Sequence, residues 1–193
     1  MNNPLYMFIG KSASGKTTVA DLLEKNCDLI QLQSYTTRPK RHENEIGHVF
    51  LTNEEFDELE NIVAFTEYNG NRYGATAEQV DSVSIYVIDV DGVETLLENY
   101  QTERPIVAIY FEASLRTRID RMINRGDSDM AIVSRLYNDE EFDWQKKLSK
   151  IIWHYKNNIG RDVEMYVVDA NKNIVNVIEQ AVSYMDIRLE GTQ

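Results

Sequence analysis

The sequence predicts an α/β fold in three layers, with a mostly parallel sheet covered by helices on both faces. Short apolar runs that suit buried strands alternate with amphipathic segments that suit helices. The 193 residues include only three prolines and nine glycines, and they contain no internal repeat or low-complexity tract. No flexible linker therefore divides the chain, and we expect one domain with a sizeable apolar core.

The apolar runs predict strands at residues 5–9, 29–33, 84–89, 105–111 and 163–168. The periodic segments predict helices at about 15–26, 91–100, 113–125, two stretches within 128–157, and 173–186. Two polar segments, 34–83 and 126–159, interrupt the alternation. We expect both to be insertions over the carboxyl ends of the strands, the first with a short helix opened by a capping box at Thr52 and Glu55.

Composition narrows the class of partner. With 20 basic and 32 acidic side chains the net charge is −12, which argues against a nucleic acid polymer or an anionic membrane as the main partner. Cys27 is the only cysteine, so no internal disulfide can form, as suits a reducing compartment. We see neither a signal peptide at the start of the sequence nor an apolar run of membrane-spanning length. We therefore expect a cytoplasmic protein.

The stretch from Gly10 to Thr17 fits the P-loop pattern G-x-x-x-x-G-K-[ST] between an expected strand and an expected helix. Glycines let the main chain turn tightly around a phosphate, and the helix start adds unpaired N–H groups. Lys16 would add a full charge, and the Thr17 hydroxyl suits Mg²⁺. The alternative is an ordinary Gly/Ser turn. The expected ATP-binding residues are Gly10, Ser12, Ala13, Ser14, Gly15, Lys16, Thr17 and Thr18.

Three further groups of charged residues could serve a phosphate site. Residues 34–41 place three cations in four positions beside hydroxyl groups, so that Arg38 and Arg41 could each grip a phosphate. The alternative for this segment is a solvated basic turn. Asp89 and Asp91 end an apolar strand and could hold Mg²⁺. Their alternative is a strand-end turn, with Asp91 as the cap of the next helix.

Arginines gather in the third group. Arg118, Arg121 and Arg125 share one helix face, and Arg135 follows. Such guanidinium groups could stabilise a phosphoryl group in transfer; the alternative, for Arg118 as for the others, is a surface stripe paired with acids. Trp144 and the apolar residues after it are interpreted as helix-packing residues.

Taken together, these motifs resemble the guanylate kinase family over most of the chain. Residues 34–41 are similar to its S-x-T-T-R-x-x-R segment, residues 70–74 to G-N-x-Y-G, and residues 87–91 to I-L-D-I-D. Arg121, Arg125 with Gly126, and Arg135 with Leu136 resemble the arginine motifs of its lid.

The resemblance implies a P-loop kinase core at 1–33, 84–125 and 160–193, a monophosphate-binding insert at 34–83 and a helical lid at 126–159. It also assigns residues to the acceptor. These are Ser34, Arg38, Arg41, Tyr73 and Asp89, to which His48 and Thr66 are added as nearby candidates.

This sequence departs from the family at the acceptor base. Counted back from Gly74, the glutamate that reads guanine falls on Ala64, and a hydroxyl residue falls on Ala75. Glu67 would face the opposite side of a strand, whereas Thr66 shares the face of Ala64. His48 stands where a phosphate-binding tyrosine is expected.

The resulting hypothesis is an ATP- and Mg²⁺-dependent nucleoside monophosphate kinase acting on small-molecule nucleotides, with GMP or dGMP as the leading acceptor. The catalytic residues would be Lys16, Arg38, Arg121, Arg125 and Arg135, and the metal residues Thr17, Asp89 and Asp91. The alternatives are a kinase for another acceptor, such as another nucleotide, a deoxynucleotide or a ribose bisphosphate, and a non-catalytic binding module. We expect a monomer or a homodimer.

Overall fold

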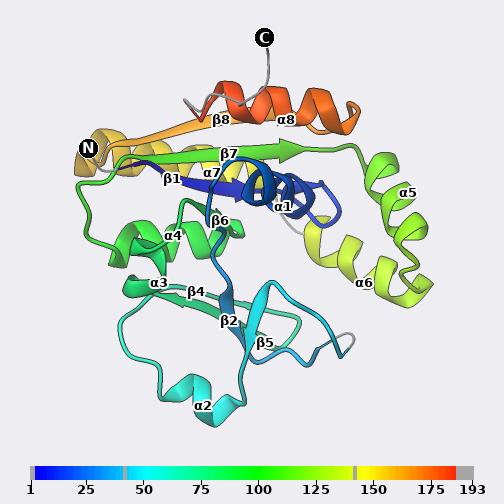
Figure 1. Cartoon of the computed structure of the whole chain (residues 1–193), viewed down its shortest axis with the longest axis horizontal. Coiled ribbons are helices and arrows are strands. Elements are labelled where there is room, and N and C mark those ends of the chain that lie inside the picture. Colours follow the sequence, from blue (N-terminus) through cyan, green and yellow to red (C-terminus); the bar gives the residue numbers. More distant parts are fainter. Residues whose placement is uncertain (1–2, 41–42, 141–142, 186–193) are drawn as a thin grey trace.

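The computed structural model describes residues 3–40, 43–140 and 143–185 (Figure 1). Four parallel strands form the central sheet in the order β6-β1-β7-β8. Their bounds are β1 Leu5–Ile9, β6 Ile85–Val87, β7 Ile106–Glu112 and β8 Val163–Asp169. Parallel strands need crossover connections, so the carboxyl ends of all four strands meet at one edge.

Helices cover both faces of this sheet. On β1, Leu5, Met7 and Ile9 join a core cluster with α4 (Val90–Asn99) and α7 (Trp144–His154). Tyr6 and Phe8 point the other way, into a cluster with α1 (Lys16–Asn26) and α8 (Ile174–Ser183). Alternate residues of a strand face opposite sides, so one buried strand serves two cores. The expected three-layer α/β fold is confirmed.

A second, mixed sheet lies below the central sheet in Figure 1. Its strand order is β3-β2-β5-β4, with bounds β2 Ser34–Thr36, β3 His48–Phe50, β4 Ile62–Tyr68 and β5 Asn71–Thr76. Two short helices, α2 (Asn53–Asp57) and α3 (Ala77–Asp81), accompany it. The capping box at Thr52 and Glu55 is confirmed, since each side chain accepts the other's main-chain N–H, at 3.1 and 2.7 Å.

One side chain of α4 joins the two sheets. The hydroxyl of Thr95 accepts the N–H of Phe65 on β4 at 2.9 Å and donates to the Phe65 carbonyl at 3.0 Å. Both hydrogen-bonding groups of this strand residue are thereby satisfied by a helix of the core. The second sheet is thus attached to helix α4 of the central layer by hydrogen bonds as well as by the chain itself.

The segment 126–159, the expected lid, contains the two helices that the periodicity within 128–157 predicts, α6 (Asp129–Glu140) and α7. The helix before this segment, α5 (Leu115–Arg125), ends at Gly126, whose φ of 85° suits glycine. After α7 a π-helical turn, η1 (Tyr155–Ile159), leads to β8. No helix within the described ranges is both long and apolar enough to cross a membrane.

The strand predicted at 29–33 is wrong. Only Gln31 forms a bridge there, to Ile85, although the Leu32 N–H also donates to the Ile85 carbonyl. Ile30 is 56% exposed. This segment runs briefly along the edge of β6 and then crosses to the second sheet, where the next strand begins at Ser34. An apolar run can therefore line a sheet edge without joining the sheet.

We expect Gly10→Ala to destabilise the fold where β1 passes into the P-loop. A Cβ atom there would lie 2.7 Å from the Phe111 carbonyl oxygen and 2.7 Å from the Ser14 hydroxyl. Because the first contact is with main chain of β7, the loop has to move, at a cost of about 1–3 kcal/mol. Thermal and urea unfolding measure this cost. The control is Gly70→Asn, at a turn where φ is 70° and a Cβ meets nothing within 4 Å. Equal stability of Gly10→Ala and wild type would contradict the steric argument.

Candidate active site

The P-loop connects β1 to α1 at the carboxyl edge of the central sheet. Gly15 is the N-cap of α1, with a left-handed φ of 97°, and no side chain caps this end of the helix. The first N–H groups of α1 have no intrahelical partner, and the helix dipole is positive here. This end of the helix is therefore suited to bind an anion, as the sequence motif predicts.

Lys16 places a cation inside this loop. Its Nζ donates to the Lys11 carbonyl at 3.3 Å. Burial lowers the pKa of Lys16 to about 8, the nearby carboxylates of Asp139 and Asp89 raise it in part, and Arg118 and Arg135 lower it further. A partly buried, incompletely compensated ammonium group favours the arrival of a polyanion.

A cavity of about 600 Å³ opens beside the P-loop. It is lined by Ala13, Gly15, Lys16, Thr17, Thr18, Leu22, Arg121, Arg125 and Ile174. Arg121 shapes its wall, because its guanidinium donates to the carbonyls of Ser14 at 2.8 Å and Ala170 at 2.7 Å. Most of the predicted ATP-binding residues and two of the predicted catalytic arginines thus border one space, which we call the donor cavity.

Other predicted phosphate-binding arginines are held by acids. Arg38 forms a bidentate ion pair with Glu45, in which Nη1 donates to Oε2 at 3.2 Å and Nη2 donates to Oε1 at 2.8 Å. Arg125 and Arg135 both approach Asp127, whose Oδ2 lies 3.6 Å from the Arg135 Nε. The three guanidinium groups are therefore already oriented by carboxylates.

Arg118 is not part of a surface stripe, and this alternative is wrong. Its side chain is 2% exposed and pairs with Asp139 of α6 at 2.6 Å. Arg118 lies on the buried side of α5, whereas Arg125 at the end of the helix is half exposed. Seven residues span almost two turns, so the two side chains leave the same face of α5 but lie about 10 Å apart along its axis, and only Arg118 is covered by α6. Asp139 has no recognisable motif, so sequence reasoning missed it.

The second sheet presents a polar face toward the P-loop side of the molecule. Strand register places Tyr73 opposite both Thr36 and Thr66, so these side chains share a face. The Ser34 hydroxyl lies 3.0 Å from His48 Nδ1, and the His48 ring is 5.8 Å from that of Tyr73. Four of the predicted acceptor residues, Ser34, His48, Thr66 and Tyr73, are thereby brought onto one surface; Arg41 lies outside the described residues.

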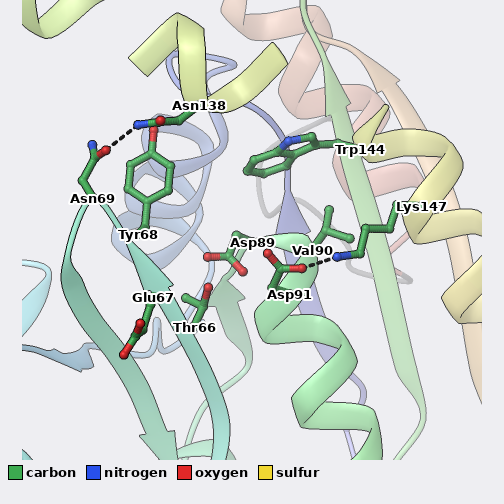
Figure 2. A pocket seen from close by; sticks show the side chains of 10 residues that line it. All are labelled: Thr66, Glu67, Tyr68, Asn69, Asp89, Val90, Asp91, Asn138, Trp144 and Lys147. Carbon is green, nitrogen blue, oxygen red and sulfur yellow. Dashed lines mark hydrogen bonds and ion pairs between the residues drawn. The ribbon is translucent and has the colours of Figure 1, made fainter. Parts of the chain in front are cut away.

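A smaller cavity of about 220 Å³ lies between β4, α4 and the lid helices (Figure 2). Thr66 and Asp89 point into it from one side, while Trp144 covers it from the other. Asp91 forms an ion pair with Lys147 at its rim. The prediction that Trp144 is a packing residue is confirmed by its contact with the core, yet its ring also lines this cavity.

Of the two aspartates at the end of β6, Asp89 and not Asp91 caps the helix. The Asp89 carboxylate accepts the Gly92 N–H at 2.7 Å, and burial raises its pKa. The interpretation of Asp91 as the cap is therefore wrong; the helix begins one residue earlier than its apolar pattern predicts. Thr17 lines the donor cavity, and Asp89 lines the smaller cavity, from which its charge acts on Lys16. A hydroxyl and a carboxylate are oxygen donors of the kind that Mg²⁺ accepts along with water and phosphate oxygens.

Ala64 and Ala75 stand directly opposite each other on β4 and β5 and are 1% and 0% exposed. Both belong to the apolar core cluster. Glu67 pairs in register with Arg72, one residue out of phase with Thr66, and therefore lies on the other face. No carboxylate of β4 therefore replaces the guanine-reading glutamate that the family resemblance places at Ala64.

Similarity to known proteins agrees with this arrangement. A guanylate kinase of Rhodopirellula baltica is 32% identical over 148 residues, covering 68% of this chain and 70% of that protein. The chain belongs to the guanylate kinase family. A guanylate kinase of Fusobacterium nucleatum is 25% identical over 193 residues, covering 92% of this chain and 97% of its own length. A scan of protein-family models gave no match. The family is one of phosphotransferases, so the chain is a member of an enzyme family.

Solved structures show the same fold. The guanylate kinase of Anaplasma phagocytophilum superposes with a TM-score of 0.55 at 17% identity, covering 99% of this chain and 88% of that one. A sugar kinase from Janibacter sp. HTCC2649 superposes with a TM-score of 0.51 at 17% identity, covering 96% and 95%. The architecture is therefore shared by kinases that are named for different substrates.

We expect the Lys16 ammonium to lose its proton near pH 8 in the free protein. The ¹³C resonance of its ε-carbon, followed against pH, measures this, and Lys16→Met assigns the signal. Between pH 8 and about 10.4 an unfolded chain binds more protons at this position, so the contribution of Lys16 to the free energy of unfolding rises with pH. A midpoint above 10 would contradict the burial of the ammonium group.

Proposed function

We propose that the protein transfers the γ-phosphoryl group of ATP to GMP or dGMP, with Mg²⁺ as the metal. One observation carries the proposal. Lys16 lines the donor cavity, Asp89 and Thr66 of the polar face line the smaller cavity, and the charge of Asp89 acts on Lys16. A donor and a phosphorylated acceptor can therefore meet above the P-loop, and membership of the family names the reaction.

The residues divide the work by charge. Lys16 and the N–H groups of α1 hold the donor phosphates, while Arg38, with Ser34 and Tyr73 beside it, takes the acceptor phosphate. An oxygen of that phosphate forms a bond to the γ-phosphorus as the bond to the β,γ-bridging oxygen breaks, so ADP leaves with the electron pair. The transition state is loose, and alignment and charge compensation supply most of the acceleration.

Three arginines are suited to neutralise the group in transfer. Arg121 and Arg125 line the donor cavity, and the charge of Arg135 acts on Lys16. Mg²⁺ would partly neutralise the charge of the donor phosphates. Thr17 and Asp89 are the residues that would hold it. Asp91, the third predicted metal residue, is paired with Lys147.

A coupled assay with Mg²⁺, ATP and a panel of acceptors tests the function. We expect turnover with GMP and dGMP. Because Ala64 and Ala75 offer no polar groups to guanine, the preference for GMP over AMP should be roughly 10- to 200-fold, not the 10⁴–10⁵ that unpaired buried polar groups confer. Turnover confined to a sugar phosphate or to another nucleotide would show that this compound, and not GMP, is the acceptor. No ATP consumption with any acceptor would refute the kinase.

We expect Arg135→Ala to lower kcat by about 10³-fold or more, because an arginine at the transferred phosphoryl group acts mainly in the transition state. The KM for GMP should change by less than about threefold. Steady-state kinetics measure both constants. Arg116→Ala is the matched control, since Arg116 is exposed on α5 and its only close acid, Asp120, is 3.9 Å away among the described residues. Unchanged turnover in Arg135→Ala would exclude that residue from the mechanism.

A further inference from the structure

A buried ion pair joins the lid to the core. Arg118 of α5 and Asp139 of α6 lie 2.6 Å apart, and their side chains are 2% and 1% exposed. Removing two charges from water is costly, and such a pair often stabilises a fold no better than apolar residues would. We therefore ask which groups this ion pair holds in position.

Ser12 of the P-loop is the third member of this group. Its main-chain N–H donates to Asp139 Oδ2 at 2.8 Å, and its hydroxyl donates to Oδ1 at 3.3 Å. Arg118 Nε donates to the Ser12 carbonyl at 3.0 Å. Both main-chain polar groups of one P-loop residue are thus held by a lid acid and its partner.

This group lies outside the donor cavity. The cavity lining includes Ala13, Gly15 and Lys16 but none of the three residues of the group. Asp139 therefore does not occupy the space of a ligand in the donor cavity. It holds the loop from behind and leaves the N–H groups of α1 open to that cavity.

The same helix carries Arg135 toward the P-loop. Arg135 and Asp139 are four residues apart on α6, so their side chains leave one face of the helix one turn apart. Fixing Asp139 against Ser12 therefore fixes the approach of Arg135, which also contacts Asp127 at 3.6 Å. The charge of Arg135 is felt by Lys16, as expected if both face one site.

We propose that Asp139 is a positioning residue for phosphoryl transfer. Held by Arg118, its carboxylate pins α6 to the Ser12 main chain, and this pin presents Arg135 to the phosphoryl group that passes between donor and acceptor. The inference rests on the proposed function. Asp139 itself touches neither nucleotide and acts through Arg135.

The first test is Asp139→Asn in steady-state kinetics with ATP and GMP. Misplacing an aligned group by about 1 Å can cost on the order of 10²-fold, so kcat should fall by roughly that factor. The KM values should stay within about threefold, because the lining of the donor cavity is intact and the charge of Asp89 still acts on Lys16. Tighter ATP binding with unchanged kcat would show that the carboxylate competes with phosphate, and it would overturn the proposal.

The second test asks whether the effect passes through Arg135. In an Arg135→Ala background, Asp139→Asn should lower kcat by less than about threefold further, since there is no guanidinium left to aim. Independent, multiplying losses would overturn the proposal, because they would mean that Asp139 acts by another route.

Two control variants separate a loss of positioning from a loss of folding. Asp129→Asn removes a carboxylate from the exposed start of the same helix and should leave kcat within about twofold. If Asp139→Asn unfolds, the double variant Arg118→Met with Asp139→Leu removes both buried charges and keeps the volume. It should remain folded and still lose roughly 10²-fold in kcat. Wild-type kcat in this variant would refute the positioning role.

A measurement without substrate separates this inference from the proposed function. Hydrogen–deuterium exchange of the α6 peptide should speed up at least tenfold in Asp139→Asn, because the helix is no longer pinned. If wild type proved inactive with GMP while this change occurred, the proposed function would fail and the lid anchor would stand. Unchanged exchange would refute the anchor whatever the activity.

Discussion

The burial of one ammonium group at the start of α1 is the constraint on which the rest of the structure depends. Lys16 is placed there by a strand that ends at the sheet edge and a loop that turns through Gly10 and Gly15. Enclosing a cation requires compensation, and the protein supplies it from two directions. Asp89 comes from the end of β6, and Asp139 comes from the lid. The end of β6 and helix α6 therefore converge on a single charge.

Carboxylates hold four arginines in and beside the site, whereas main-chain carbonyls hold Arg121. Glu45 holds Arg38, Asp127 holds Arg125 and Arg135, and Asp139 holds Arg118. The chain has a net charge of −12, so it contains more acidic side chains than basic ones, and carboxylates are available for these pairs. Arginines that are already oriented lose less entropy when a phosphate replaces their carboxylate, although the ion pairs have to be broken first. This exchange suits a site that must release a charged product as well as bind a charged substrate.

The sequence predicts the core of the fold well because local rules govern it. The strand at 5–9 has the predicted bounds, and the helices at 15–26, 91–100 and 113–125 begin and end within about two residues of their predicted limits. The interpretation fails where tertiary contacts decide. Residues 29–33 have a strand pattern but lie along an edge, and Arg118 has a surface pattern but is buried by α6. Asp139 could not be found, because its partners Ser12 and Arg118 are 127 and 21 residues away.

The hydroxyl of Thr95 has a consequence for how these molecules behave when they are crowded together. Strand β4 is at the margin of its sheet, and such margins recruit strands from neighbouring molecules. Because Thr95 takes both the N–H and the C=O of Phe65, the middle of β4 offers no free ladder to an intruding strand. One threonine of α4 thus protects this margin of the second sheet from edge-to-edge aggregation, without using any side chain of the polar face of that sheet.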